Sequence, residues 1–401
     1  MRIQHYSRDK SSDSGITKYL SNLKNNVFII YILVSVFIAI YRLIFMWRIS
    51  LAEFYADEKN WAEVSNSSNF ISNAFTLDAG YFVPLTRSVF WIVSKLSSTP
   101  ETVIHLAGCI IAGFCCSSLI LFHNINVKIH KKVIIALCLG IYQSFDLLLW
   151  MNLNYYLFIV CCFFLFNRLT MKIEVNSKIT KFFAMLLMIS LGKPQLSLSC
   201  CFLLFATLYV KGFRFKSLSK WYFEIGLIVS LVTSILFSRL NSNYLELNIA
   251  TDNFLFAVAG ILNIPFVVMV PILAIGNSKI SEVINNSNYD LSFNILSIIF
   301  SIIVYFLLYR NKPKNLKFLH FFSFGLIPVY FSLFIFANTG WANNFFWNNN
   351  CISCMSSRHI FPVYFFALMI LQLYSKNRFS KLLLVQILFL NVIYLLNRQI
   401  F

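Results

Sequence analysis

Long apolar runs separated by short polar segments make up the chain from about residue 27 to its end. Many of these runs reach the ~20 residues that an α-helix needs to cross a hydrocarbon core about 30 Å thick. Two runs differ: 82–97 is short and contains two basic residues, and 253–275 is broken by Pro265 and Pro271. The pattern predicts membrane-spanning helices throughout, with 82–97 and 253–275 as interfacial or re-entrant helices on the outer side.

Basic residues mark the segments between the runs. Most of the 33 Lys and Arg residues lie in six segments: 1–26, 123–132, 167–181, 211–220, 310–317 and 375–381. Because Lys and Arg collect in cytoplasmic loops, we assign all six to the cytoplasmic side, and an even number of crossings must join consecutive segments. Within 181–211 the Lys193-Pro194 step divides the apolar stretch into two short helices. The pattern predicts about eleven crossings, with the N-terminus inside and the C-terminus outside.

This topology predicts a simple domain organisation. A basic cytoplasmic tail, 1–26, precedes a single transmembrane domain, 27–401. The sizeable outer segments of that domain are 48–100, 240–291 and 338–358. We find no internal repeat, which disfavours a transporter built from inverted repeats.

Composition agrees with an all-α polytopic membrane protein. The chain is 59% hydrophobic and 12% charged, whereas soluble domains contain about 25% charged residues. The net charge of +18 therefore indicates orientation in a membrane and not nucleic-acid binding. Most cysteines lie in apolar runs, where they pack as small hydrophobes. Cys351 and Cys354 lie in a polar outer segment, and their pairing is open.

The first outer segment holds an unusual share of the carboxylates. Five of the fifteen Asp and Glu residues occur there: Glu53, Asp57, Glu58, Glu63 and Asp78. The adjacent pair Asp57 and Glu58 offers a general base that takes the proton of an attacking hydroxyl. The same pair would also suit a divalent cation such as Mg²⁺ or Mn²⁺. A solvated acidic loop is the alternative.

Cations occur at the predicted outer ends of several helices. Arg87 closes the motif DAGYFVPLTR, Lys193 lies in LGKPQL, and Arg358 with His359 opens a late helix. Their depth and charge suit the phosphate of a lipid headgroup, and the planar fork of arginine matches phosphate oxygens. Simple anchoring at the membrane boundary is the alternative for each of them.

Amide and aromatic side chains gather at the outer turns. The motif WMNLNYYL (150–157) and the segment GWANNFFWNNN (340–350) have the residue types that hydrogen-bond and stack on sugars, and also those of a membrane-interface belt. The predicted contacts to sugar or acceptor are Asp78, Tyr81, Asn152, Asn154, Tyr155 and Trp341.

In this order, the motifs resemble those of the GT-C class of integral-membrane glycosyltransferases. The resemblance depends on the acids Asp57 and Glu58, on Gly80-Tyr81 followed by Pro84 and Arg87, on the Asn-Tyr turn at 152–155, on Lys193-Pro194, and on Arg358-His359. Two features depart from the class: the spacing of Pro84 and Arg87, and the lack of a soluble outer domain.

The resemblance implies a donor, an acceptor and a location. The donor would be an undecaprenyl-phosphate sugar, with a hexose such as glucose, and the acceptor a lipid-linked or lipopolysaccharide glycan such as O-antigen. Transfer would invert the anomeric centre on the periplasmic side of a bacterial inner membrane, with membrane lipids as further partners. Asp57, or else Glu58, would act as base, and Arg87, Lys193 and Arg358 would bind the phosphate.

Three other functions fit parts of the sequence. An O-antigen polymerase is also polytopic and acts on lipid-linked glycans, but it typically has functional arginines in later loops. A lipid-linked glycan flippase or other transporter would have ionisable residues paired inside its spans, where this chain has only a few, such as Arg42, Asp146 and Glu224. An acyltransferase would need a histidine-based centre, which the six His residues do not suggest.

Overall fold

Helices account for all the regular structure in the part of the chain that the computed structural model describes, where no strand occurs. The described residues are 12–49, 57–76, 82–122, 128–141, 153–170, 178–211, 221–240, 258, 261–266, 291–311, 325, 327, 329 and 357–373. The helices are α1 (Ser12–Ile49), α2 (Asp57–Ser67), α3 (Phe70–Phe75), α4 (Pro84–Lys95), α5 (Pro100–Phe122), α6 (Ile129–Ile141), α8 (Leu153–Thr170), α9 (Lys178–Ile189), α10 (Pro194–Lys211), α11 (Tyr222–Leu240), α15 (Leu291–Arg310) and α19 (Ser357–Leu373). The predicted all-α class is confirmed for this part of the chain.

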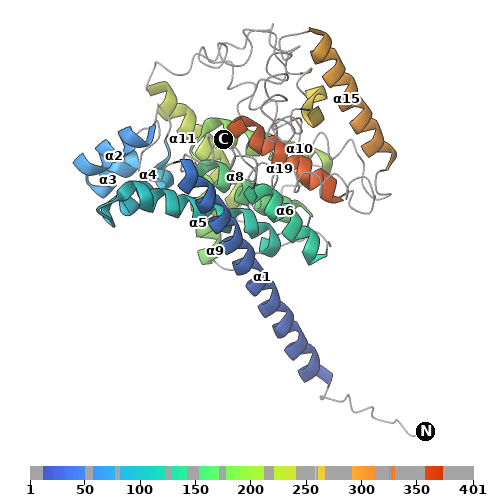
Figure 1. The fold of residues 1–401 in the computed structure, drawn as a ribbon, viewed down its shortest axis with the longest axis horizontal. Coiled ribbons are helices and arrows are strands. Elements are labelled where there is room, and N and C mark those ends of the chain that lie inside the picture. The colour runs from blue at the N-terminus through green and yellow to red at the C-terminus, as the bar shows by residue number, and fades with distance from the viewer. Residues whose placement is uncertain are drawn as a thin grey trace.

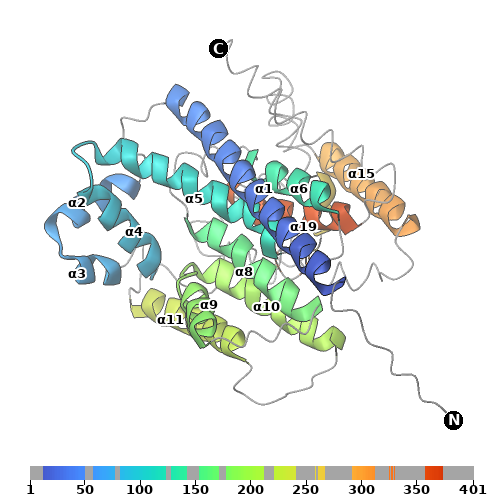
Figure 2. The same ribbon diagram turned by 90° about the horizontal axis from the view of Figure 1, so that it is seen from below.

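Two of these helices are long and apolar enough to cross a bilayer, namely α1 over Asn26–Ile44 and α5 over Pro100–Leu121. They pack closely against each other (Figure 2). At their contact the Ser35 and Ser117 hydroxyls share a hydrogen bond. A Cβ added at Gly113 would collide with the Ser35 carbonyl oxygen. Small residues thus let the two backbones approach, as is typical of helices packed within membranes.

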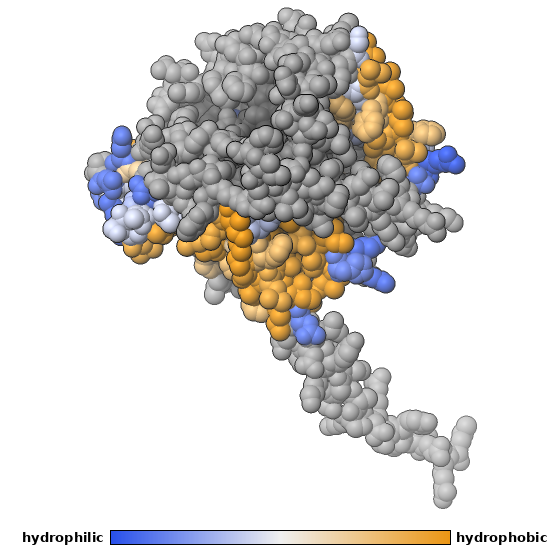
Figure 3. Space-filling model, in the orientation of Figure 1, coloured by the Kyte–Doolittle hydropathy of each residue, from blue (hydrophilic) through white to orange (hydrophobic). Residues whose placement is uncertain are grey.

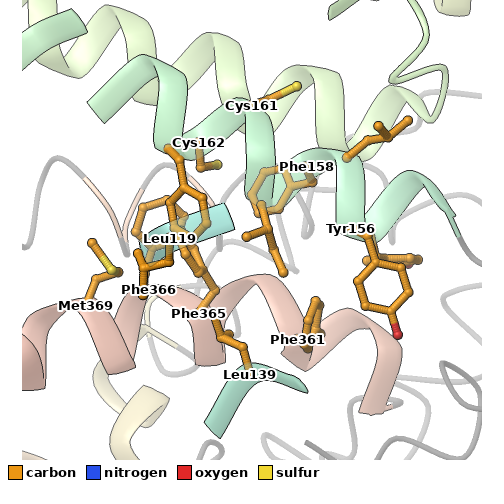
Figure 4. Close-up of a cluster of buried hydrophobic side chains, with 14 of the residues drawn as sticks. Leu119, Leu139, Tyr156, Phe158, Cys161, Cys162, Phe361, Phe365, Phe366 and Met369 are labelled. Atoms are coloured by element: carbon orange, nitrogen blue, oxygen red, sulfur yellow. The ribbon is translucent and has the colours of Figure 1, made fainter. Parts of the chain in front are cut away.

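The core lies where α5, α6, α8 and α19 meet (Figure 4). Phe163 of α8 packs on Phe365 of α19 with ring centroids 5.2 Å apart. The Tyr364 hydroxyl donates to the Cys138 carbonyl oxygen at 3.2 Å, which ties α19 to α6. The cysteines of these helices are free thiols in apolar surroundings, as the sequence predicts.

The predicted break at Lys193-Pro194 is confirmed. Helix α9 ends at Ile189 and α10 begins at Pro194, where a missing N–H is harmless. Between them Gly192 has φ 58°, in the left-handed region that glycine adopts readily. A Cβ there would collide with the Phe82 carbonyl oxygen, so the turn also requires glycine for its close approach to the start of α4.

Helix α4 accounts for most of the predicted interfacial segment 82–97. It has 12 residues, so at 1.5 Å per residue it is about 18 Å long, too short for a ~30 Å hydrocarbon core. Of the other predicted non-crossing segment, 253–275, only 258 and 261–266 lie within the described residues, with helical turns at 261–262 and 264–266.

The segment 1–26, predicted as a basic cytoplasmic tail, lies within the described residues from Ser12 onward. Residues from Ser12 onward are helical and continue without a break into the apolar part of α1. The N-terminal turns of α1 project from the rest of the protein (Figure 1). Basic residues such as Lys18 and Lys24 are good helix formers, so their polarity does not end the helix.

Large apolar side chains are exposed on the outward faces of α1, α5, α9, α11 and α15. Figure 3 shows such a surface on the lower side of the body, where α1 leaves it. Examples are Leu33, Phe114, Phe183, Leu236 and Phe306. Exposed apolar surface of this extent, together with two helices of spanning length, indicates association with a membrane.

Candidate functional site

The first turn of α8 connects four of the motifs that the sequence singled out. Asn154, Tyr155 and Tyr156 follow one another there, and each is at most 3% exposed. Consecutive side chains on a helix point about 100° apart, because 3.6 residues complete a turn. The three side chains therefore contact three different parts of the chain.

Asn154 contacts α4. The Thr86 hydroxyl donates to the Asn154 Oδ1 atom at 2.8 Å, and both side chains are buried. Pro84 occupies the first position of α4, where its fixed φ favours helix initiation. The proline of the DAGYFVPLTR motif thus positions Thr86 and, next to it, Arg87.

Tyr155 contacts the turn between α9 and α10. The Nζ atom of Lys193 lies 5.6 Å from the centroid of the Tyr155 ring, a cation–π distance. The turn is fixed on its other side by Ser234 of α11, whose hydroxyl donates to the Gly192 carbonyl oxygen at 2.7 Å. Lys193 is partly exposed, so its ammonium group is held in place without being enclosed.

Tyr156 contacts α1 and α19. The guanidinium carbon of Arg42 lies 5.4 Å from the Tyr156 ring centroid, and Arg42 Nη1 donates to the Gly140 carbonyl oxygen at 3.0 Å. On another side, Phe361 meets Tyr156 edge to face with centroids 6.0 Å apart, and Figure 4 shows the two rings at one end of the core cluster. Phe361 follows Arg358 by three residues, so the start of α19 lies near this turn.

Arg87 connects the same region to the acidic helix. Its guanidinium carbon lies 5.0 Å from the ring centroid of Trp61 in α2, and the side chain is only 3% exposed. Trp61 packs edge to face on Phe90, with centroids 5.4 Å apart. Asp57 begins α2 one helical turn before Trp61. Helix α2 is thereby held against α4, next to the contact of α4 with α8.

Three cations of this region each pack on an aromatic ring. Arg42, Arg87 and Lys193 each lie over an aromatic ring, and two of the three rings belong to the first turn of α8. A helix N-terminus adds partial positive charge. Arg42, Arg87 and Lys193 thus bring three positive charges to the elements that surround this turn.

The predicted site residues fall into three groups. Tyr155 contacts Lys193, and Asn154 contacts Thr86, the sequence neighbour of Arg87. Asp57, Glu58, Arg358 and His359 are placed by their helix backbones, at the starts of α2 and α19. Outside the described residues lie Asp78, Tyr81, Asn152 and Trp341, and also Cys351 and Cys354.

Two placements were not expected. Arg87 was predicted at the membrane surface, open to a phosphate, but it is buried beneath Trp61. Arg42 was noted only as an isolated charge in a span, but it contacts the same helix turn as Lys193. The arginine within an apolar run was the available signal, since an ionisable residue there is a candidate for function. Thr86 and Tyr156 gave no such signal.

The Mg²⁺ or Mn²⁺ site predicted at Asp57 and Glu58 stays a prediction. The described residues contain no group of three or more His, Cys, Asp or Glu side chains that could hold a metal ion. The side chains of Asp57 and Glu58 lie outside that description.

No protein-family model, no curated protein and no solved structure matches this chain.

Proposed function

We propose that the chain is a membrane glycosyltransferase of the GT-C type. In this proposal it crosses a bacterial inner membrane about eleven times and works on the periplasmic side. It moves a hexose such as glucose from an undecaprenyl-phosphate sugar to a glycan such as O-antigen, with inversion. The activated donor is lipid-linked, so the reaction requires no nucleotide.

One observation carries the proposal. Residues from α4, from the Gly192 turn and from α1 and α19 meet at three consecutive side chains, Asn154, Tyr155 and Tyr156. The motifs at 78–87, 150–157 and 191–196 are far apart in sequence, and nothing in the apolar pattern alone requires them to meet. The cations Arg42 and Lys193 contact two of these side chains, and Arg87 lies next to Thr86, which contacts the third. Positive charge around the three side chains would favour the binding of an anionic headgroup.

The cations would have different roles in binding the donor phosphate. Lys193 is the partly exposed one, so it would contact the donor phosphate directly, with Arg358 near the start of α19. Arg87 is buried and would act through its charge and by holding Trp61 in place. Fixed positive charge of this kind stabilises the phosphate as negative charge develops on it in the transition state.

Asp57 would serve as the general base, with Glu58 as the second candidate. The carboxylate takes the proton of the acceptor hydroxyl while the hydroxyl oxygen forms a bond to the anomeric carbon. The bond from that carbon to the phosphate oxygen breaks, and its electron pair leaves with the lipid phosphate. Attack from the face opposite the leaving group inverts the anomeric centre.

The test compares carboxylate removal at two positions of α2. Asp57→Asn is expected to abolish transfer while the protein still accumulates in the membrane. Glu63→Gln is the matched control, since it removes an exposed carboxylate from the same helix. Both variants are expressed in a host that supplies the lipid-linked donor, and the surface polysaccharide is analysed by mass spectrometry.

The mass of the product also separates the alternatives. Addition of one hexose per repeat supports the transferase, whereas a change only in the number of repeats supports a polymerase. If the Asp57→Asn variant modifies the glycan at a near-normal rate, the assignment of Asp57 is wrong.

A further inference from the structure

The short helices α3 and α4 expose large apolar side chains along one edge. Ile71 and Phe75 lie four residues apart on α3, and Ile92 and Leu96 lie four residues apart at the end of α4, so each pair shares a helix face. Their exposed fractions are 70% for Ile71, 61% for Phe75, 46% for Ile92 and 72% for Leu96. We call these four side chains the α3–α4 edge.

The two helices that carry these side chains pack against each other. Phe70 of α3 meets Trp91 of α4 edge to face, with ring centroids 5.4 Å apart. The neighbouring helix α2 turns Trp61 inward toward Phe90 and exposes polar side chains such as Asn66. The large exposed apolar side chains of the α2–α4 unit thus lie on α3 and α4, whereas α2 exposes polar ones.

Groups typical of a membrane interface border the edge. The Trp91 indole N–H donates to the Ser68 carbonyl oxygen at 3.2 Å, and Lys95 Nζ lies 5.9 Å from the Trp91 ring centroid. A tryptophan with a satisfied N–H and a lysine whose stem covers apolar surface are common at headgroup depth.

The edge is also close in sequence to a helix of spanning length. Leu96 precedes the first residue of α5, Pro100, by four positions, and α5 is long and apolar enough to cross a bilayer over Pro100–Leu121. A segment that directly precedes a membrane span would lie at the bilayer surface.

We propose that the α3–α4 edge inserts into the boundary between headgroups and acyl chains of one leaflet, with α2 left in water above it. The occupant is lipid, since the edge offers apolar side chains bordered by Trp91 and Lys95. The inference rests on the membrane location in the proposed function and not on its chemistry. It would fix Asp57 and Trp61 just above the lipid surface.

Site-directed fluorescence in vesicles tests the insertion. Single cysteines replace Ile71, Ile92 and Leu96 in the full-length chain, with Cys351 and Cys354 changed to serine, and each carries an environment-sensitive fluorophore. The parent protein with those two serines and no added cysteine is labelled in the same way, and its signal gives the background from the remaining cysteines. The vesicles contain phosphatidylglycerol and phosphatidylethanolamine, with or without lipids that bear a nitroxide near the top of the acyl chain. Asn66→Cys on α2 is the control.

The expected result is a blue-shifted emission at 71, 92 and 96, quenched by the nitroxide lipid and not by iodide in the buffer. The label at 66 should show the reverse. Equal iodide quenching at 66 and at the three edge positions would overturn the inference. So would labels at the edge that neither quencher reaches, because protein would then cover them. No sugar donor enters the experiment, so its failure is separate from failure of the transferase assignment.

Discussion

Arg42 lies over the ring of Tyr156, with its guanidinium carbon 5.4 Å from the ring centroid. The same side chain donates to the Gly140 carbonyl oxygen at 3.0 Å and is only 3% exposed. A single arginine therefore joins α1, α6 and the first turn of α8. Since that turn also contacts Thr86 and Lys193, Arg42 holds the helix on which the candidate site depends.

Replacement of Arg42 by methionine should weaken the fold measurably. The Gly140 carbonyl loses this charged donor and Tyr156 loses the cation, so the free energy of unfolding should fall by about 2 kcal/mol. A double-mutant cycle with Tyr156→Leu, followed by unfolding in mixed micelles, should give a coupling energy of about 1 kcal/mol. Additive effects of the two substitutions would show that the pair does not interact.

The hydrogen bond between Thr86 and Asn154 offers a matched pair of substitutions. Thr86→Val keeps the side-chain shape but removes the hydroxyl, which leaves the buried Asn154 Oδ1 atom without this donor, at a cost of about 1–3 kcal/mol. Thr86→Ser keeps the hydroxyl and should retain most of the stability. The midpoint of thermal unfolding in detergent measures both. Equal midpoints for the serine and valine variants would contradict the hydrogen bond.

Gly192 should not tolerate alanine. Its φ of 58° costs an L-residue about 1–2 kcal/mol, and the added Cβ would collide with the Phe82 carbonyl oxygen. We expect a lower unfolding midpoint and a displaced Lys193. Gly226→Ala is the milder comparison. Its Cβ would lie 3.0 Å from Met185 Cγ and 3.2 Å from the Met185 Cα and carbonyl oxygen, whereas the Cβ at Gly192 would lie 2.4 Å from the Phe82 oxygen, and alanine favours a helix. A larger loss at Gly226 than at Gly192 would refute this account of the turn.

The sequence predicted local features better than tertiary ones. The break before Pro194 follows from the missing N–H of proline, and the start of α4 at Pro84 follows from its fixed φ. The burial of Arg87 could not be predicted, because it depends on Trp61 arriving from another helix. Helix α3 was missed because six residues are too few for a periodic pattern.

For the candidate site too, the sequence identified individual residues but not their tertiary contacts. Lys193, Asn154 and Tyr155 could be identified from their residue types at predicted helix ends, but their mutual contacts could not. Arg42 carried a signal, as a charge in an apolar run, without any indication of its partner. Its contact with Tyr156 brings together residues more than 100 positions apart in the sequence, which the apolar pattern of α1 does not encode.

Lys193 gives the most direct test of anion binding at this site. Lys193→Met removes the partly exposed ammonium group, whereas Lys193→Arg keeps the charge next to Tyr155. If Lys193 contacts the donor phosphate, loss of one charged hydrogen bond costs about 1.5–3 kcal/mol, so the Kd for undecaprenyl phosphate should rise roughly ten- to hundredfold in the methionine variant. The Kd of the arginine variant should stay near that of the parent protein.

Binding is measured with the purified protein in detergent by native mass spectrometry, without a sugar acceptor. Unchanged affinity in Lys193→Met, in a protein with the parent's unfolding midpoint, would exclude Lys193 from the phosphate site and leave the start of α19 as the place to search.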